Sequence, residues 1–446
     1  MGSQHGRGMM ENRWTRMILA GAMLGMTFGP AAAAMADEPD NAALKAEIEV
    51  LKNRLASLEN KLDRQSAMST APTAIGEKPA GGGIELPSGL AGLQMSGYVD
   101  SSYIYNFNKI DPGANSGQTN RGRVFDTNNG FTIQAAKLTL EKPVSDDELI
   151  GFRTDMMFGD DAEVIHSTGL GGGGTPTDSF DLEQAYAVLR APVGNGLDFK
   201  VGKFVTLLGA EVIESPSNWN FSRSFLFGYA IPFTHTGALA TYSFGDMGST
   251  TIGLVNGWDI VDENNNFKTM IGNITLTPVS GVSLGINGIT GAERTSDNRN
   301  DRSVIDLVAS WTPIEKLSLM ANYDYGHESS MTTGTTATTG FDTADWHGVA
   351  LYAKYDFDDK WSLAGRTEWF NDLGNTRTGF TGPSGGTIQN DHFWEWTATL
   401  QRKIHEHVLA RLEFRHDQAS EHVFLEQGGG KTNSQDTIAT EVIYHF

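Results

Sequence analysis

The 446-residue sequence contains no cysteine, so it can form neither a disulfide nor a thiolate metal site. A serine hydrolase needs a positioned nucleophile, base and orienting group. No strand-to-helix elbow of the G-x-S-x-G type and no H-E-x-x-H metal motif is predicted. We therefore predict no catalytic residue, no cofactor and no metal site. An outer-membrane enzyme stays a minor alternative, to be tested by mutating His347 or His445.

Basic residues are also scarce. The chain has 33 Lys and Arg against 54 Asp and Glu, a net charge of −21. Nucleic-acid binding requires clustered Lys and Arg to contact phosphates, so this acidity disfavours nucleic acid as a partner.

Beyond the first 36 residues, no stretch approaches the ~18 consecutive apolar residues that a spanning helix needs. Within those 36 residues, Arg13 and Arg16 precede an apolar run at 17–28, and small residues follow at 34–36. This order is typical of a secretory signal peptide. We assign residues 1–36 to it, with an anchor helix as the less favoured alternative.

The next segment, residues 37–63, carries a heptad pattern. Its apolar positions are Leu44, Ile48, Leu51, Leu55, Leu58 and Leu62. A single amphipathic helix of this length is marginal in water, so we expect it to self-associate as a coiled coil. Residues 64–92 are rich in Ser, Ala, Thr, Pro and Gly, and we interpret them as a flexible linker.

From residue 93 to 446, short runs alternate apolar and polar side chains. The last run is the clearest, because Ile438, Val442 and Tyr444 share one face of a strand while Glu441 and His445 share the other. Aromatic residues gather near the ends of the apolar faces, as in the interfacial girdles of membrane barrels. A secreted sandwich or propeller would need a second layer over each apolar face, and no covering helices are predicted.

The links between these runs alternate strictly in length. The short links lie near residues 142–148, 191–196, 245–249, 277–281, 312–316, 356–360 and 403–407. The long links lie near residues 109–130, 159–179, 206–235, 259–266, 291–301, 327–344, 371–390 and 418–433. Fifteen links join 16 strands, and bacterial outer-membrane barrels have even strand numbers, short periplasmic turns and long outer loops. The sequence predicts an all-β fold, a 16-stranded antiparallel transmembrane barrel with a periplasmic coiled-coil helix.

Charged residues in phase with the polar faces should point into the lumen, because a lipid-facing Arg would cost ~2–4 kcal/mol at the bilayer midplane. These pore-lining candidates are Arg366, Glu368, Arg411, Glu413, Arg415 and Glu441. The alternative is that they pair along the wall and only stabilise the barrel.

The long link at 206–235 mixes charged residues with many apolar ones, which an exposed loop would not need. We expect it to fold into the barrel and narrow it, with Glu211, Glu214 and Arg223 near the constriction. The alternative is an external packing or subunit-contact loop.

Six short motifs carry a family resemblance. They are Ser96-Gly97-Tyr98-Val99-Asp100, Gly202-Lys203-Phe204, Gly209-Ala210-Glu211, Asn220-Phe221-Ser222-Arg223-Ser224, His235-Thr236-Gly237 and Asn256-Gly257-Trp258. In this order, over about 94–446, the chain resembles the beta-barrel porin family described as OmpL-like. The resemblance implies an outer-membrane protein with channel activity and names no substrate.

We predict a passive channel for small hydrophilic solutes or ions in the outer membrane of a Gram-negative bacterium. Its expected partners are outer-membrane lipid and two further copies of the chain in a homotrimer. An alternative role is a structural tether to the cell wall through the heptad helix. Acidic links at 259–266 and 297–301 could offer oxygen ligands to Ca²⁺, but they lack the spacing of an EF-hand, and we expect solvated loops.

Overall fold

The computed structural model describes residues 92–110, 120–170, 179–329, 343–382, 388 and 390–446. The chain divides into two units, residues 1–62 and 63–446, and all described residues belong to the second. The predicted signal peptide (1–36), heptad helix (37–63) and linker (64–92) lie outside the described residues, apart from Gly92. Among the described residues, no helix is both long enough and apolar enough to cross a membrane.

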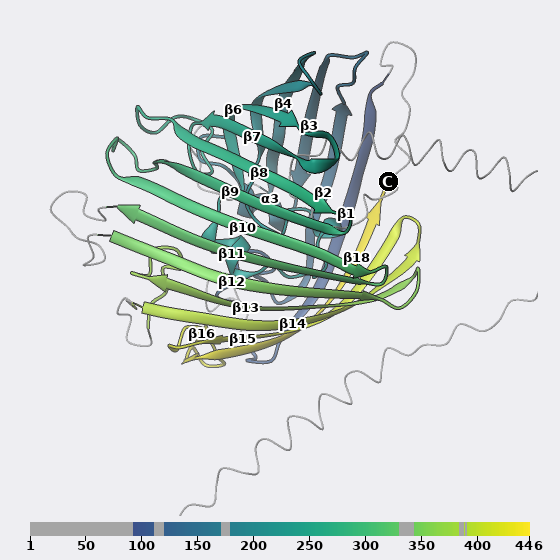
Figure 1. Cartoon of the computed structure of the whole chain (residues 1–446). Helices are drawn as coiled ribbons and strands as arrows, with labels where there is room; N and C mark the ends of the chain where they lie inside the picture. The colour runs from purple at the N-terminus through teal and green to yellow at the C-terminus, as the bar shows by residue number, and fades with distance from the viewer. Residues whose placement is uncertain (1–91, 111–119, 171–178, 330–342, 383–387, 389) are drawn as a thin grey trace, which may run out of the picture. The chain divides into compact units, whose positions relative to one another are not determined.

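Sixteen antiparallel strands close into one barrel (Figure 1). They are β1 Gln94–Asn106, β2 Gly130–Lys142, β3 Ile150–Phe158, β4 Phe180–Ala191, β5 Leu197–Val205, β6 Thr234–Ser243, β7 Gly248–Val255, β8 Thr269–Val279, β9 Val282–Ala292, β10 Asp301–Ile314, β11 Leu317–Ser329, β12 Thr343–Asp356, β13 Trp361–Leu373, β14 Asn390–His405, β15 Val408–Ala419 and β18 Ser434–His445. Each strand pairs with its neighbour in sequence, and β18 pairs with both β15 and β1. The predicted 16-stranded all-β fold is confirmed.

The links follow the predicted alternation of short and long. The short ones range from 280–281 to 143–149, and the long ones range from 293–300 to 206–233. The C-terminus lies at the same end as the short turns β8–β9 and β10–β11 (Figure 1). By the rule for bacterial barrels, this end is periplasmic and the long links face outward.

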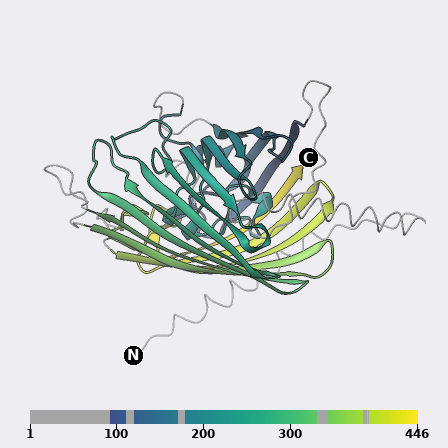
Figure 2. The same ribbon diagram turned by 45° about the horizontal axis from the view of Figure 1, so that its top comes forward.

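The strands alternate as predicted between an exposed apolar face and a buried polar one. On β1, Val99 and Tyr103 are exposed, while Asp100 and Ser102 between and beside them are buried. The outward side chains would meet hydrocarbon and the inward ones the lumen. Figure 2 shows the wall as a continuous curved sheet.

The barrel closes where the C-terminal residue meets the first strand. The Phe446 backbone N–H donates to the Gly97 carbonyl at 2.9 Å, and the Gly97 N–H donates to the Phe446 carbonyl at 3.0 Å. A Cβ at residue 97 would lie 2.3 Å from the Lys137 carbonyl oxygen and 2.9 Å from the Phe446 ring. Only glycine fits this contact, so the closing pair depends on Gly97.

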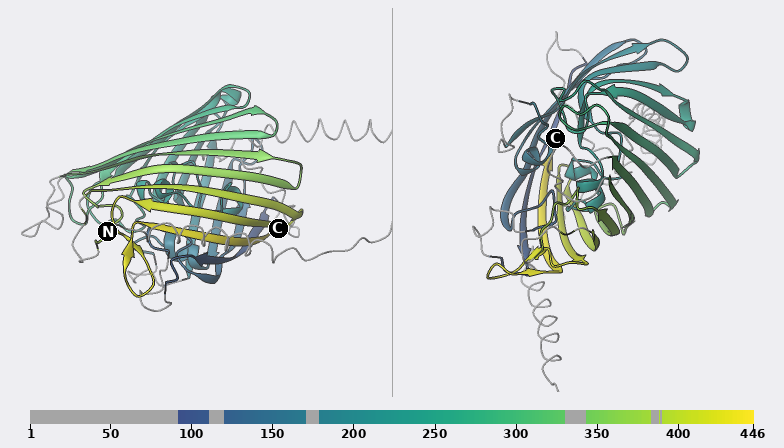
Figure 3. Two further views of the ribbon diagram at one scale, coloured as in Figure 1. Left: turned by 90° about the horizontal axis from the view of Figure 1, so that it is seen from below. Right: turned by 90° about the vertical axis from the view of Figure 1, so that its left-hand side faces the viewer.

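Several links contain structure that the sequence analysis did not predict. Helix α3 (Asp160–Ile165) lies in the β3–β4 link, and the β15–β18 link contains a small hairpin of β16 (Phe424–Leu425) and β17 (Lys431–Thr432). The β5–β6 link, residues 206–233, contains the 3₁₀ turn η1 (Ser215–Ser217) and the π-helical turn η2 (Leu226–Ala230). In the right-hand view of Figure 3 this teal segment lies within the ring of strands. We call residues 206–233 the inner loop.

The main hydrophobic core lies inside the barrel, between the inner loop and the wall. Its wall members point inward from successive strands and include Leu239, Val255, Ile271, Ile289, Val304 and Met320. Its inner-loop members include Leu207, Ile213, Trp219, Phe225, Phe227 and Ile231. The sequence analysis expected polar side chains inside, so the apolar lining on β6–β11 is a difference. It arises because the inner loop brings its own apolar residues to cover that lining.

Candidate functional site

The inner loop crosses the barrel interior and is tied at both ends. Its first residue, Thr206, donates its backbone N–H to the Phe233 carbonyl at 2.8 Å. Asp259 Oδ1, from the β7–β8 link, accepts from the N–H groups of Phe233 and Thr234 at 2.8 and 2.9 Å. The loop therefore leaves and re-enters the wall between the paired strands β5 and β6.

Two wall carboxylates hold the loop backbone. Glu368 on β13 accepts from the N–H groups of Phe225 and Leu226 at 2.5 and 3.1 Å. Glu413 on β15 accepts from the N–H groups of Phe221 and Ser222 at 2.7 and 3.0 Å. Hydrogen bonds to an ionised acceptor are about twice as strong as neutral ones. These four bonds fix the middle of the loop against β13 and β15.

Arg366 on β13 joins the loop to the wall at one side-chain cluster. Its Nη1 donates to Glu211 Oε1 and to the Ser222 carbonyl, both at 2.6 Å. Its Nε donates to Glu395 Oε1 on β14 at 2.8 Å. Arg366 is 2% exposed, so this paired charge is screened little by solvent.

Two arginines of β15 donate to loop carbonyls. Arg411 Nη1 and Nη2 donate to the carbonyls of Ser215 and Asn218 at 3.0 and 2.5 Å. Arg415 Nη1 donates to the Arg223 carbonyl at 2.5 Å. A guanidinium presents several donors in a fixed plane, which suits the binding of several carbonyls of an irregular loop.

The loop's charged side chains reach other parts of the interior. Arg223 donates to the Phe221 carbonyl at 2.7 Å and lies 3.5 Å from the Asp161 carboxylate on α3. Glu214 contacts Lys137 Nζ of β2 at 2.5 Å, and its side chain is 21% exposed. The loop thus spans from β13–β15 to β2 across the interior.

All nine pore-lining candidates contact the inner loop or lie on it. Eight are buried, and Glu214 is half-buried: the set is Glu211, Glu214, Arg223, Arg366, Glu368, Arg411, Glu413, Arg415 and Glu441. Most of them hold the loop in place through hydrogen bonds. That these nine side chains line an aqueous path stays a prediction.

The wall at β2–β4, separated from β15 by β18 and β1, carries acidic residues that the sequence analysis did not single out. Lys137 Nζ lies 3.0 Å from Asp155 and 2.8 Å from Glu183, in addition to Glu214. Oxygens of these three carboxylates lie within 4.8 Å of one another, and the lysine ammonium already contacts all three. Period-two alternation on β2, β3 and β4 places all three wall residues inward, so that signal could have identified them.

Asp100 on β1 extends this acidic wall. It is fully buried, and among the described residues neither of its carboxylate oxygens accepts a hydrogen bond. Its neighbour is Glu441, another carboxylate. Neither oxygen of Glu183 accepts a hydrogen bond either, although Glu183 keeps its ion pair with Lys137. Buried carboxylates without donors are costly unless water or cations reach them.

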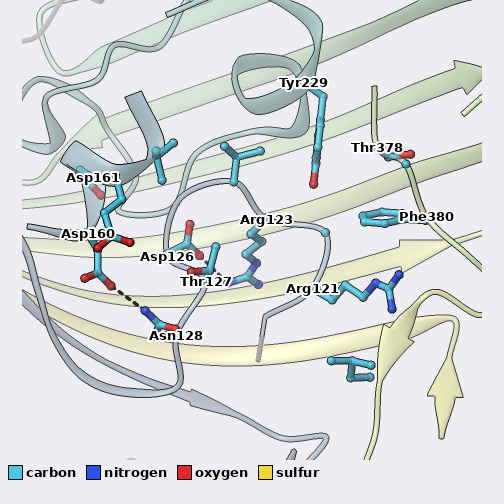
Figure 4. A pocket seen from close by; sticks show the side chains of 16 residues that line it. Arg121, Arg123, Asp126, Thr127, Asn128, Asp160, Asp161, Tyr229, Thr378 and Phe380 are labelled. Carbon is cyan, nitrogen blue, oxygen red and sulfur yellow. Dashed lines mark hydrogen bonds and ion pairs between the residues drawn. The ribbon is translucent and has the colours of Figure 1, made fainter. Parts of the chain in front are cut away.

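A cavity of about 660 Å³ lies among the outer links (Figure 4). It is lined by parts of the β1–β2, β3–β4, β13–β14 and β15–β18 links and by Tyr229 of the inner loop. Burial raises the pKa of Asp161, at its edge, to about 7, against the opposing effect of Arg223. A second, apolar cavity of about 920 Å³ lies on the outer face, among outward side chains such as Leu284, Trp311 and Leu351.

The links proposed for Ca²⁺ use their acids in hydrogen bonds of the protein itself. Asp259 accepts from the inner loop as described above, and Asp297 accepts from the Arg299 backbone N–H at 2.9 Å. The expectation of solvated loops without Ca²⁺ stays a prediction.

A closed antiparallel barrel with an exposed apolar belt and charged side chains inside is the architecture of an outer-membrane channel. The chain belongs to the family described as "Putative beta-barrel porin-2, OmpL-like", whose model matches residues 92–446. It is accordingly a porin, a passive diffusion channel of the Gram-negative outer membrane. The resemblance drawn from the sequence motifs is confirmed.

Solved structures show the same fold at low sequence identity. An anion-selective porin from Comamonas acidovorans is 11% identical with a TM-score of 0.53, over 79% of this chain and 99% of that one. The outer-membrane channel DcaP of Acinetobacter baumannii is 12% identical with a TM-score of 0.51, over 79% and 97%. OmpT of Vibrio cholerae in a trimer form is 10% identical with a TM-score of 0.50, over 79% and 99%. No curated protein matches the chain.

Proposed function

We propose that the inner loop forms the constriction of this diffusion channel and that solutes pass between the loop and the β1–β4 wall. The observation that carries this proposal is the contrast in hydrogen bonding. On β13 and β15, donors and acceptors are paired with the loop. On β1, neither oxygen of the buried Asp100 accepts a hydrogen bond from the described residues, and on β4 Glu183 Oε1 accepts none while Oε2 has only its ion pair with Lys137. Water along this wall would satisfy them.

The charge balance around the inner loop supports a preference for cations. The acidic side chains at the loop and its adjoining wall are Asp100, Asp155, Asp161, Glu183, Glu211, Glu214, Glu368, Glu395, Glu413 and Glu441. The basic ones are fewer: Lys137, Arg153, Arg223, Arg366, Arg411 and Arg415. A ring of excess carboxylate in a narrow passage attracts cations and repels anions.

The test is planar-bilayer recording of the refolded protein in a KCl gradient. We expect a reversal potential whose sign shows that K⁺ permeates more readily than Cl⁻. The double variant Asp100→Asn/Glu183→Gln should move that potential toward zero. Asp297→Asn, which removes one charge from the β9–β10 link, should leave it unchanged. A wild-type reversal potential that shows Cl⁻ to be the more permeant ion would overturn the cation preference. If the double variant has the same reversal potential as the wild type, the solute route does not follow the β1–β4 wall.

The assembly and its orientation are part of this proposal. A homotrimer is supported by the trimer form of the similar Vibrio barrel. The heptad helix would stand in the periplasm, because the chain's short turns and C-terminus share one end of the barrel. Cross-linking of the purified protein, with and without residues 41–62, tests the oligomer. Tethering to the cell wall rests on residues outside the described part and stays a prediction.

Family membership supports a channel over an enzyme. The letters of G-x-S-x-G do occur at 281–285 and 382–386. The first stretch spans the β8–β9 turn and the start of β9, where a strand follows instead of the helix that a nucleophile elbow requires. The second stretch lies in the β13–β14 link, mostly outside the described residues.

A further inference from the structure

The cavity at the outer mouth is built by links that are distant in sequence. Its lining comes from residues 121–128, from helix α3, from Tyr229 of the inner loop, from residues 378–380 and from Leu425. By the porin rule these links face outward, so the cavity lies where a solute would enter. Its volume, about 660 Å³, falls in the range of small-molecule sites.

One end of the cavity is acidic. Helix α3 contributes Asp160, Asp161 and Glu163 to the lining. Asp160 Oδ2 accepts from Asn128 Nδ2 at 2.7 Å. Asp126 also lines the cavity, is 5% exposed, and has one carboxylate oxygen, Oδ1, without a hydrogen bond from the described residues. This end is therefore suited to a ligand ammonium group.

The other end is basic and aromatic. The Arg121 guanidinium lies over the Phe380 ring at 5.3 Å and makes a long contact of 3.5 Å to Thr381 Oγ1. Figure 4 shows Arg121 and Phe380 on the side opposite Asp160 and Asp161. Arg123, between the two ends, is already paired with Asp126 and with Asp417 of β15, so it offers little to a ligand.

A fixed aromatic side chain lies between the ends. The Tyr229 ring stacks on Phe370 with centroids 6.2 Å apart and meets Phe380 edge-on at 6.4 Å. In Figure 4 its hydroxyl points toward the space between Asp126 and Arg121. Packed rings present a preformed apolar face at little entropic cost on binding.

We propose that this cavity binds short zwitterionic peptides of two or three residues before they pass the constriction. The ammonium would lie at the α3 carboxylates, the carboxylate at Arg121 and an apolar side chain against Tyr229. In a single amino acid the ammonium and the carboxylate are bonded to one carbon, whereas the two charged ends of the cavity lie on opposite sides of it (Figure 4). A simple cation would leave Arg121 unused. The inference rests on the proposed function, because it assigns a solute class to the same route.

The test is titration calorimetry on the detergent-solubilised full chain with the tripeptide Ala-Phe-Ala. Its N-acetylated and C-amidated forms each lack one terminal charge. We expect saturable binding of the free peptide and about tenfold weaker binding of each blocked form, the scale of one lost charge-assisted contact. No saturable binding, or equal binding of all three peptides, would overturn the proposal.

Variants at each end of the cavity test which terminus of the peptide binds there. Asp160→Asn/Glu163→Gln should abolish the preference for a free N-terminus and keep the preference for a free C-terminus. Arg121→Gln should do the reverse. Arg299→Gln, an exposed change in the β9–β10 link, is the matched control for a lost positive charge. A loss of both preferences in either variant would contradict the two-ended arrangement.

KCl conductance of the same preparations separates this inference from the proposed function. Conductance with the expected cation sign but no peptide binding would refute the peptide site alone. Peptide binding in a protein without the expected conductance would refute the constriction proposal alone. A heat-shifted band in gel electrophoresis confirms that each variant is folded.

Discussion

The two sides of the barrel interior use the same residue types in different ways. On β13–β15, Arg366, Glu368 and Glu413 bind the inner loop through short, paired hydrogen bonds. On β1–β4, Asp100 and Glu183 are equally buried, but Asp100 accepts no hydrogen bond from the described residues and Glu183 has only its ion pair with Lys137. Inward charge therefore has two uses in one barrel. Inward charged side chains fix the inner loop where its hydrogen-bond donors and acceptors match theirs. Where no protein donor meets a buried carboxylate, hydration has to stabilise it.

The largest effect should come from removing a charge on β13–β15 that binds the inner loop. Arg366→Met would remove the ion pairs of Arg366 with Glu211 and Glu395, and removing one partner of a buried pair costs about 3–5 kcal/mol. Reversible urea unfolding in lipid vesicles measures the loss. Exposed Lys316→Met on the periplasmic β10–β11 turn is the control. A change below about 1 kcal/mol, the range of exposed pairs, would show that the cluster is not structural.

Shortening the inner loop tests whether the segment bound by β13–β15 narrows the channel. Deleting residues 219–227 removes the segment that Glu368 and Glu413 bind, along with much of the apolar cover of the wall. We expect a rise in single-channel conductance, because an open 16-stranded barrel leaves an aqueous channel. Deletion of 427–429, at the tip of the β16–β17 hairpin, is the control. An unchanged current would place the constriction elsewhere.

Removing a carboxylate from β1–β4 should change the ion selectivity of the channel and change its stability little. In Glu183→Gln the side chain keeps its volume, but Lys137 loses one of its three carboxylates. We expect a lower K⁺/Cl⁻ permeability ratio from reversal potentials, while the urea midpoint moves less than in Arg366→Met. The opposite pattern, a large loss of stability with unchanged selectivity, would show that both sides serve only to hold the fold.

The smallest effect should be a pH dependence from α3, which lies outside the strands. Burial raises the pKa of Asp161 to about 7, so this carboxyl is neutral below that pH and charged above it. Cation preference should therefore increase between pH 6 and pH 8. Stability contributed by this group should fall as pH rises from about 4, the ordinary Asp value, through 7. Asp161→Asn should flatten both trends, and a retained pH dependence would assign them to another group.

The barrel was predictable because lipid on one side of a strand and lumen on the other impose a period of two. That pattern located the strands and the alternation of short and long links. It also placed Arg366, Glu368 and Glu441 inward. The same rule applied to β2 and β4 would have added Lys137 and Glu183, which the analysis passed over; register shifts in the β1–β2 and β3–β4 pairings interrupt the alternation there.

The loop partners were not predictable. Glu368 contacts Phe225 and Leu226 across more than 140 residues of sequence, and no local pattern encodes which backbone N–H a wall carboxylate will meet. The close approaches are also nonlocal. A Cβ at Gly326 would lie 1.9 Å from the Trp346 ring, and the Trp346 indole N–H donates to the Ala230 carbonyl at 3.0 Å.

By itself, the sequence determined the strand number, the faces of the strands and the family, because these follow from local alternation and from short motifs. Only the tertiary structure decided which inward charges are neutralised by the inner loop and which remain without donors. The physical reason is that a charge's surroundings are set by chain segments far away in sequence. In this barrel those segments meet only once β18 has closed on β1.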